Sequence, residues 1–126
     1  MEATNYALTL RELNRFEDAK SLLLQMTPVA RRVLGETHTR TLKMRCLYAV
    51  ALYREAGATF DDLREAVAML EETARNIRRV LGGTHPTTLD IERDLQDARA
   101  ALREREASSG VATRTRAARA RRSEEE

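Results

Sequence analysis

The side chains best suited to acid–base or metal chemistry in this sequence are two histidines and one cysteine. No cysteine or carboxylate recurs around His38 and His85 at the spacing of a metal site. A nucleophilic cysteine needs a histidine base and an orienting partner, whereas Cys46 lies in the most apolar stretch of the chain. We therefore expect Cys46 to be a small core residue, and the histidines to cap or pack against a following helix.

Acidic pairs offer another route to catalysis, because two carboxylates can act as general acid and general base. Asp61-Asp62 and Glu71-Glu72 lie among arginines in helical sequence, which favours surface charge and helix capping. The Leu81–Thr84 segment is not a phosphate loop, since it has neither a preceding strand nor a lysine. The sequence thus predicts no catalytic, metal-binding or cofactor-binding residues, no cofactor, and a protein that is not an enzyme.

The two histidines belong to an internal repeat. Val33–Leu42 returns as Val80–Leu89 at an offset of 47 residues, with seven of ten positions identical. The same offset holds upstream as far as Asp18-Ala19 and Glu65-Ala66, and then shrinks, which indicates an insertion near Gly57. Self-similarity at such a period is typical of helical repeat proteins.

Each repeated unit is predicted to be a pair of helices. Gly35 and Gly82 follow apolar stripes and are suited to end a helix with a positive φ. Thr59 or Asp61 can cap a helix start, and Pro28 predicts a kink within the second helix. The predicted helices cover Ala3–Leu13, Phe16–Leu34, Arg40–Ala56, Asp61–Leu81 and Pro86–Glu106.

The apolar patterns predict that these helices stack. The Asp61–Leu81 helix carries one broad apolar stripe, whereas the Arg40–Ala56 helix is apolar all round and must be covered on both sides. The Pro86–Glu106 helix has a narrower stripe and a charged outer face, as expected of a terminal capping helix. The predicted fold is therefore all-α: an α-solenoid of antiparallel helix pairs, with about five helices, in a domain of residues 1–106.

Residues 107–126 carry the whole charge excess of the chain. Residues 1–106 contain 17 basic and 17 acidic side chains, so the net charge of +2 comes from the five arginines and three glutamates that follow. This Arg/Ala-rich segment is predicted to be a disordered tail. Nucleic acid is disfavoured as a partner because the tail has no aromatic residues for base stacking. A nucleic-acid-associated protein acting through this basic tail is the alternative function.

Two features of the sequence argue against membrane insertion and secretion. No apolar run approaches the length of a membrane span, and the first residues lack the layout of a signal peptide. With one cysteine, an internal disulfide is excluded. We expect a cytoplasmic protein with no membrane partner.

The repeated linker, Leu-Gly-x-x-His-x-x-Thr-Leu, resembles that of the kinesin light chain class of tetratricopeptide repeat. Leu81–Leu89 matches the Leu-Gly-x-x-His-Pro-x-Thr-Leu linker of this class throughout, and Leu34–Leu42 matches except at Thr39. Asn5–Leu8 is similar to the Asn-x-Ala stretch in the first helix of the family's pairs, and Asn14–Ala19 is similar to its inter-helix turn.

The resemblance covers about residues 3–106 and implies a scaffold that binds a partner protein or peptide on a concave surface. That surface is lined by the first helix of each pair. On it, Asn5, Thr9, Arg45 and Arg54 are the predicted peptide-binding residues. The chain also resembles a fragment of a longer array, because nothing precedes the Ala3–Leu13 helix. Its apolar edge predicts self-association through the N-terminal side.

Overall fold

The computed structural model describes residues 15–125, and the side chains of residues 15–108. Its helices are α2 (Phe16–Leu34), α3 (Thr39–Arg54), α4 (Phe60–Leu81) and α5 (Pro86–Glu125), and no strand occurs in this part of the chain. The fold is all-α, as predicted. The helix expected at Ala3–Leu13 lies outside the described residues.

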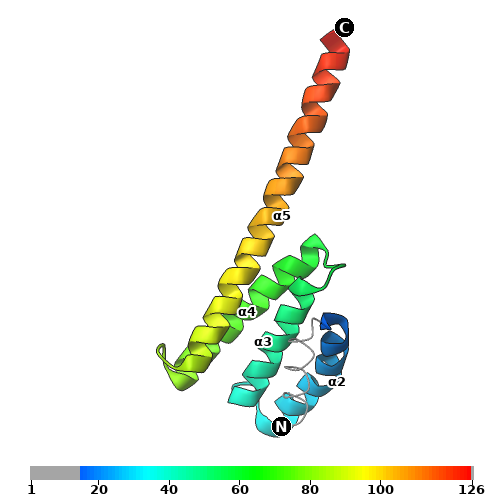
Figure 1. The fold of residues 1–126 in the computed structure, drawn as a ribbon. Helices are drawn as coiled ribbons and strands as arrows, with labels where there is room; N and C mark the ends of the chain where they lie inside the picture. The colour runs from blue at the N-terminus through cyan, green and yellow to red at the C-terminus, as the bar shows by residue number, and fades with distance from the viewer. Residues whose placement is uncertain (1–14, 126) are drawn as a thin grey trace.

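The helices stack in chain order. α3 packs between α2 and α4, and α5 packs mainly against α4 before it extends beyond the other helices (Figure 1). Short linkers make successive helices antiparallel, so the described chain forms helix pairs as the repeat predicts. No helix within residues 15–125 has an apolar stretch that could cross a membrane.

The repeat in the sequence is also a repeat in packing. Three apolar residues are buried in α2, and the residue 47 positions later is buried in α4 in each case: Ala19 and Ala66, Leu23 and Leu70, Ala30 and Ile77. Since α2 packs on α3 as α4 packs on α5, the two units bury equivalent positions against equivalent neighbours.

The two linkers have the same backbone conformation. Gly35 and Gly82 have φ angles of 100° and 92°, a region that side chains with a Cβ rarely adopt. After Gly35 the chain turns into α3, and the buried Thr41 hydroxyl donates to the carbonyl of Ala30, at 3.4 Å. The predicted role of both glycines at helix ends is confirmed.

Both histidines cap the helix that follows them. His38 Nδ1 accepts a hydrogen bond from the backbone N–H of Arg40 at 3.1 Å, and His85 Nδ1 accepts one from Thr87 at 3.1 Å. Each bond satisfies a donor that has no partner within its own helix. The predicted capping role of the histidines is confirmed.

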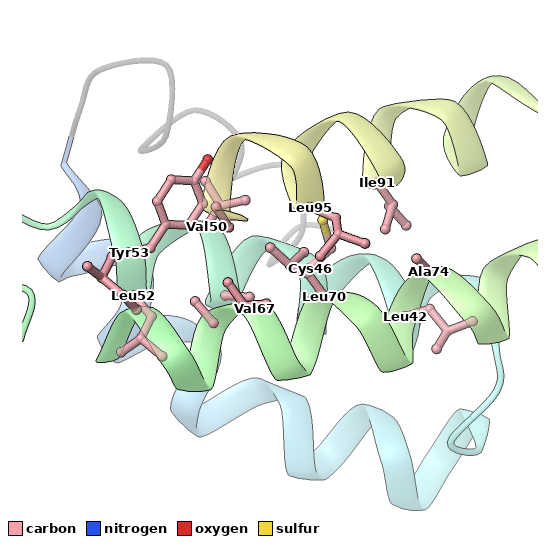
Figure 2. Packing of buried hydrophobic residues seen from close by; sticks show 14 of the residues in the cluster. Leu42, Cys46, Val50, Leu52, Tyr53, Val67, Leu70, Ala74, Ile91 and Leu95 are labelled. Carbon is pink, nitrogen blue, oxygen red and sulfur yellow. The ribbon is translucent and has the colours of Figure 1, made fainter. Parts of the chain in front are cut away.

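α3 is the central helix of the core. Ten of its 16 residues are buried, which confirms that it is covered on more than one side. Figure 2 shows Val50 and Cys46 of α3 beside Leu70 of α4 and Leu95 of α5. Cys46 is a core residue as predicted, and its thiol donates to the buried carboxylate of Asp94, with Sγ 3.4 Å from Oδ2.

The turn between α3 and α4 is short and tightly capped. α3 ends at Arg54, slightly before the predicted end, and α4 begins after Thr59. The Thr59 side chain accepts from the backbone N–H of Asp62 at 3.1 Å, and Asp62 Oδ2 accepts from the backbone N–H of Thr59 at 2.9 Å. Thr59 is therefore the N-cap, and the two residues form a capping box.

α5 differs most from the prediction, because it continues to Glu125 instead of ending near Glu106. The five-residue turn after α3, residues 55–59, is replaced at the equivalent positions 102–106 by Leu-Arg-Glu-Arg-Glu. These residues favour helix, and no glycine or β-branched residue is present to stop it. At about 1.5 Å per residue the helix is about 60 Å long. The backbone is helical as far as residue 125, in the segment that the sequence predicts to be a disordered tail.

Candidate protein-interaction surfaces

The residues with possible acid–base or metal chemistry are used for structure. The described part of the chain contains no group of three or more His, Cys, Asp or Glu side chains that could hold a metal ion. Both histidines accept capping hydrogen bonds, and Cys46 is buried beside Asp94. The surfaces of the helix stack are therefore the candidate functional sites.

Charged residues on neighbouring sides of α3 and α5 form one such surface, here called the α3–α5 face: Arg40, Lys43, Arg54, Asp90 and Asp97, all exposed. On α3, Lys43 and Arg54 follow Arg40 by three and fourteen residues, and on α5 Asp97 follows Asp90 by seven residues. These spacings place the residues of each helix on one side of it. The two helices meet where Arg54 Nη2 lies 3.8 Å from Asp97 Oδ2. The face is thus basic along α3 and mixed along α5, where Arg93 Nη1 lies 3.9 Å from Asp90 Oδ1.

Arg54 is held in place on this face by its neighbour in the sequence. Its Nε donates to the Tyr53 hydroxyl at 3.1 Å, and its guanidinium carbon lies 5.6 Å from the centre of the Tyr53 ring. Burial raises the pKa of the Tyr53 hydroxyl, while the hydrogen bond from Arg54 opposes that rise. The predicted peptide-binding residue Arg54 is therefore exposed and oriented.

Arg45, the other described residue of the predicted peptide site, lies on a different side of α3. Nine residues separate it from Arg54, which at about 100° per residue is a half-turn of the helix surface. Arg45 points to α4, where its Nη2 is 3.5 Å from Glu72 Oε2. The structure does not bring Arg45 and Arg54 together, so their placement on one surface is corrected. Asn5 and Thr9 lie outside the described residues.

Arg45 instead lines a hollow of about 200 Å³, here called the first groove. Leu24, which is 54% exposed, lies on its edge. The lining residues include no carboxylate. The lining comes from three helices: Leu23, Leu24, Thr27, Pro28 and Arg31 of α2, Arg45 and Tyr48 of α3, and Met69 of α4.

A second groove occupies the equivalent place one repeat later, between α4 and α5, with a volume of about 470 Å³. Two ion pairs span it: Arg78 Nη1 lies 3.0 Å from Glu92 Oε1, and Arg99 Nη2 lies 3.2 Å from Glu71 Oε1. Six of its lining residues occur exactly 47 positions after a residue of the first groove: Glu71, Ala74, Arg75, Arg78, Glu92 and Leu95.

The charged residues that face each other across the groove are of opposite sign in the second groove and of the same sign in the first. In the second groove Arg78 faces Glu92, but the equivalent pair in the first groove is Arg31 and Arg45, two cations that cannot bridge. Arg31 pairs instead with Glu36, with Nη2 2.6 Å from Oε1. Ion pairs between α4 and α5 span the second groove. The first groove has two arginines and no carboxylate in its lining, and its Arg45 pairs with Glu72 outside that lining.

Sequence reasoning missed the first groove although part of the signal was present. Pro28 was predicted to kink its helix and Arg45 to bind a peptide, but the two were not predicted to lie in one site. Aligning the units at the 47-residue offset shows that Leu24, Pro28 and Arg45 stand where the second unit has Glu71, Arg75 and Glu92. The outward turn of Arg31 toward Glu36 required the three-dimensional structure.

Comparison with known families supports a tetratricopeptide repeat. Residues 3–40 match the model of the tetratricopeptide repeat family. This match spans one linker and the helix α2, and the second unit repeats the packing of that helix. A search of curated proteins found no match, and a search of solved structures found none.

Proposed function

We propose that this chain is a protein-interaction scaffold of the kinesin light chain class of tetratricopeptide repeat, and that it binds a partner through the α3–α5 face. The family match and the all-α stack of helix pairs support a module for protein–protein contact. The two linkers with their Leu-Gly-x-x-His pattern support the kinesin light chain class. On this proposal the chain has no catalytic function.

One observation supports the α3–α5 face. The two units repeat the residues that the fold needs, such as the buried Leu23 and Leu70, but they do not repeat the exposed residues of this face. Lys43 has Asp90 as its equivalent, and Arg40 has Thr87. Because packing does not account for this difference, we attribute it to a partner that meets basic residues on α3 and acidic residues on α5.

Charge reversal tests the proposal. The double variant Arg40→Glu and Lys43→Glu changes two exposed side chains and leaves the His38 cap intact, because that cap uses a backbone N–H. The control is Arg79→Glu, an exposed residue of α4 away from the face. Affinity capture from cell extract with quantitative mass spectrometry should show a protein lost with the double variant and kept with the control. A captured set that is the same for all three chains contradicts the proposal.

A further inference from the structure

The last part of α5 extends away from the helix stack. Ile91 and Leu95 anchor the first half of the helix in the core, and Arg105 Nη1 donates to the carbonyl of Ala58 at 3.3 Å. Beyond these contacts α5 runs on past the other helices (Figure 1). Residues 109–125, here called the arm, cover about 25 Å at about 1.5 Å per residue. The arm is therefore a helix that the stack holds at one end.

The arm is strongly basic. Five of the nine residues from Arg114 to Arg122 are arginine, and residues 109–123 include no acidic residue. With Glu124 and Glu125, the arm has a net charge of +3, five minus two. The arginine-rich part spans about 12 Å of the helix axis, or about one positive charge per 2.5 Å. Duplex DNA carries about one negative charge per 1.7 Å. The two charge densities are thus similar in size and opposite in sign.

The fold of the stack does not require these arginines. Arg119 stands three residues from both Arg116 and Arg122, and like charges at this spacing destabilise a helix. The equivalent helix of the preceding unit, α3, ends at Arg54 and has no such extension. A unit of the same fold therefore forms without the arm, and a polyanionic partner would remove the repulsion within it.

The composition of the arm argues against a membrane surface as this partner. Helices that lie in a membrane interface bury Trp, Phe or Leu on one face, whereas Val111 is the only apolar residue of the arm larger than alanine. At about 100° per residue, the five arginine positions are distributed around the helix axis and do not follow one side of it. In a groove of a nucleic acid, phosphates flank a helix on both sides, so such a distribution is suitable there.

Duplex DNA fits the arm better than other nucleic acids. The arm has no aromatic residues, but these serve base stacking on single strands, and a duplex is bound through its phosphates. The prediction against nucleic acid therefore applies to single strands alone. The major groove of B-DNA is about 12 Å wide and admits an α-helix, whereas the deep, narrow major groove of an RNA duplex does not.

We infer that the arm binds double-stranded DNA, with its helix in the major groove and its arginines on the phosphates of both walls. Contacts to phosphates carry no sequence information, so the arm binds duplex DNA without regard to sequence. This site is separate from the α3–α5 face, whose residues lie between Arg40 and Asp97.

The test uses the full chain and a fluorescein-labelled DNA duplex of 20 base pairs and mixed sequence. Fluorescence polarisation measures binding in 50 mM and 200 mM sodium chloride. Affinity should fall at least about tenfold at the higher salt concentration, as expected when two or more phosphates are contacted. NMR shifts of the backbone amides should cluster in residues 109–125. An RNA duplex of the same sequence, and vesicles that contain phosphatidylserine, should be bound more weakly.

Two variants of equal net charge separate the arm from the charge of the whole chain. Glutamine in place of all five arginines of the arm retains a good helix former and should lower affinity at least about tenfold. The control carries glutamine at five exposed arginines of the stack, and its affinity should stay within about twofold of the parent chain. These control positions are Arg32, Arg64, Arg75, Arg79 and Arg93.

Two further variants test the helix and the sign of the charge. Ala117→Pro together with Ala118→Pro keeps every arginine but interrupts the helix, and should weaken binding several-fold. Glu124→Gln together with Glu125→Gln should tighten binding, because these carboxylates are repelled by phosphates. Circular dichroism of each variant shows whether the stack is intact.

The inference is overturned if the chain does not bind the DNA duplex, if the arm variant and the control lose equal affinity, or if the shifts lie in the stack. It is also overturned if the RNA duplex or the vesicles are bound as tightly as DNA, if the proline variant binds as the parent chain does, or if loss of the two glutamates weakens binding. These outcomes leave the proposed function untouched, since that function is tested by charge reversal at Arg40 and Lys43.

Discussion

Leu42 and Leu89 occupy equivalent positions 47 residues apart, yet Leu42 is fully buried and Leu89 is 47% exposed. The difference follows from what covers each helix. α4 folds back over α3 and buries Leu42, whereas α5 continues as one helix past the position where α3 turns. Accordingly Cys46 and Val50 of α3 are replaced in α5 by the exposed, charged Arg93 and Asp97.

The two leucines should therefore differ in their contribution to stability. Leu42→Ala should lower the free energy of unfolding by about 2–5 kcal/mol, because it leaves a cavity in the core. Leu89→Ala should cost less than about 1 kcal/mol, since much of that side chain is already in water. Urea denaturation followed by circular dichroism measures both. Equal losses would mean that α5 is covered in solution at this position.

The histidine caps provide a second test. His38→Ala removes the side chain that accepts from the Arg40 N–H and should cost about 1 kcal/mol. His38→Asn should retain most of this stability, because Asn is a favoured N-cap residue. Thermal melts of the two variants, and of the same changes at His85, check the result. A His38→Asn chain as unstable as His38→Ala would show that the imidazole acts through packing and not through capping.

The length of α5 should depend on five residues. Replacing residues 102–106 by Glu-Ala-Gly-Ala-Thr, the sequence that follows α3, should end the helix near Ala101. The reason is that glycine disfavours helix, and that threonine is a favoured N-cap at which a new helix can begin. Backbone carbon NMR shifts report the change residue by residue. As a control, five alanines at the same place should leave the helix continuous, and continuous helical shifts in the grafted chain would contradict the account.

The capping box at the start of α4 should make stability depend on pH under acid conditions. The backbone hydrogen bond from Thr59 is the main cause of the lowered pKa of Asp62. Because the folded pKa is below the unfolded value of about 3.9, the contribution is present above that value and is lost as pH falls through the folded pKa. An NMR titration of the Asp62 carboxyl should show a midpoint below the ordinary aspartate value of about 3.9. A midpoint at or above that value would exclude the hydrogen bond from the Thr59 backbone N–H in solution.

The sequence predicted the elements that depend on local signals. The bounds of α2 were predicted correctly, and Thr59 was one of the two residues predicted to cap α4, because apolar periodicity and a capping residue act within a few positions. The helix α5 was predicted too short. Charge and serine content suggested a disordered segment, but the intrinsic helix preference of Ala, Arg and Glu extends over the same residues.

The surfaces were predicted less well, because they depend on direction as well as on residue type. Arg45 and Arg54 were both predicted to bind a peptide on one concave surface, yet a nine-residue spacing separates them by half a turn. Arg31 and Arg78 are equivalent residues with different partners. Arg31 turns outward to Glu36, whereas Arg78 reaches across its groove to Glu92. This difference depends on contacts between segments. Aligning the two units shows that Arg45 stands in the place of Glu92, but the pairing of Arg31 with Glu36 is seen in the structure alone.

The most direct test of the scaffold function is to locate where a partner touches the chain. A photoreactive benzoylphenylalanine is placed at position 43 or 90 on the α3–α5 face, or at position 79 on α4 as the control, and the chain is irradiated in cell extract. The account predicts a discrete protein adduct from positions 43 and 90, identified by mass spectrometry as the same protein, and no such adduct from position 79. An adduct that forms from position 79 and from neither residue of the α3–α5 face would contradict it.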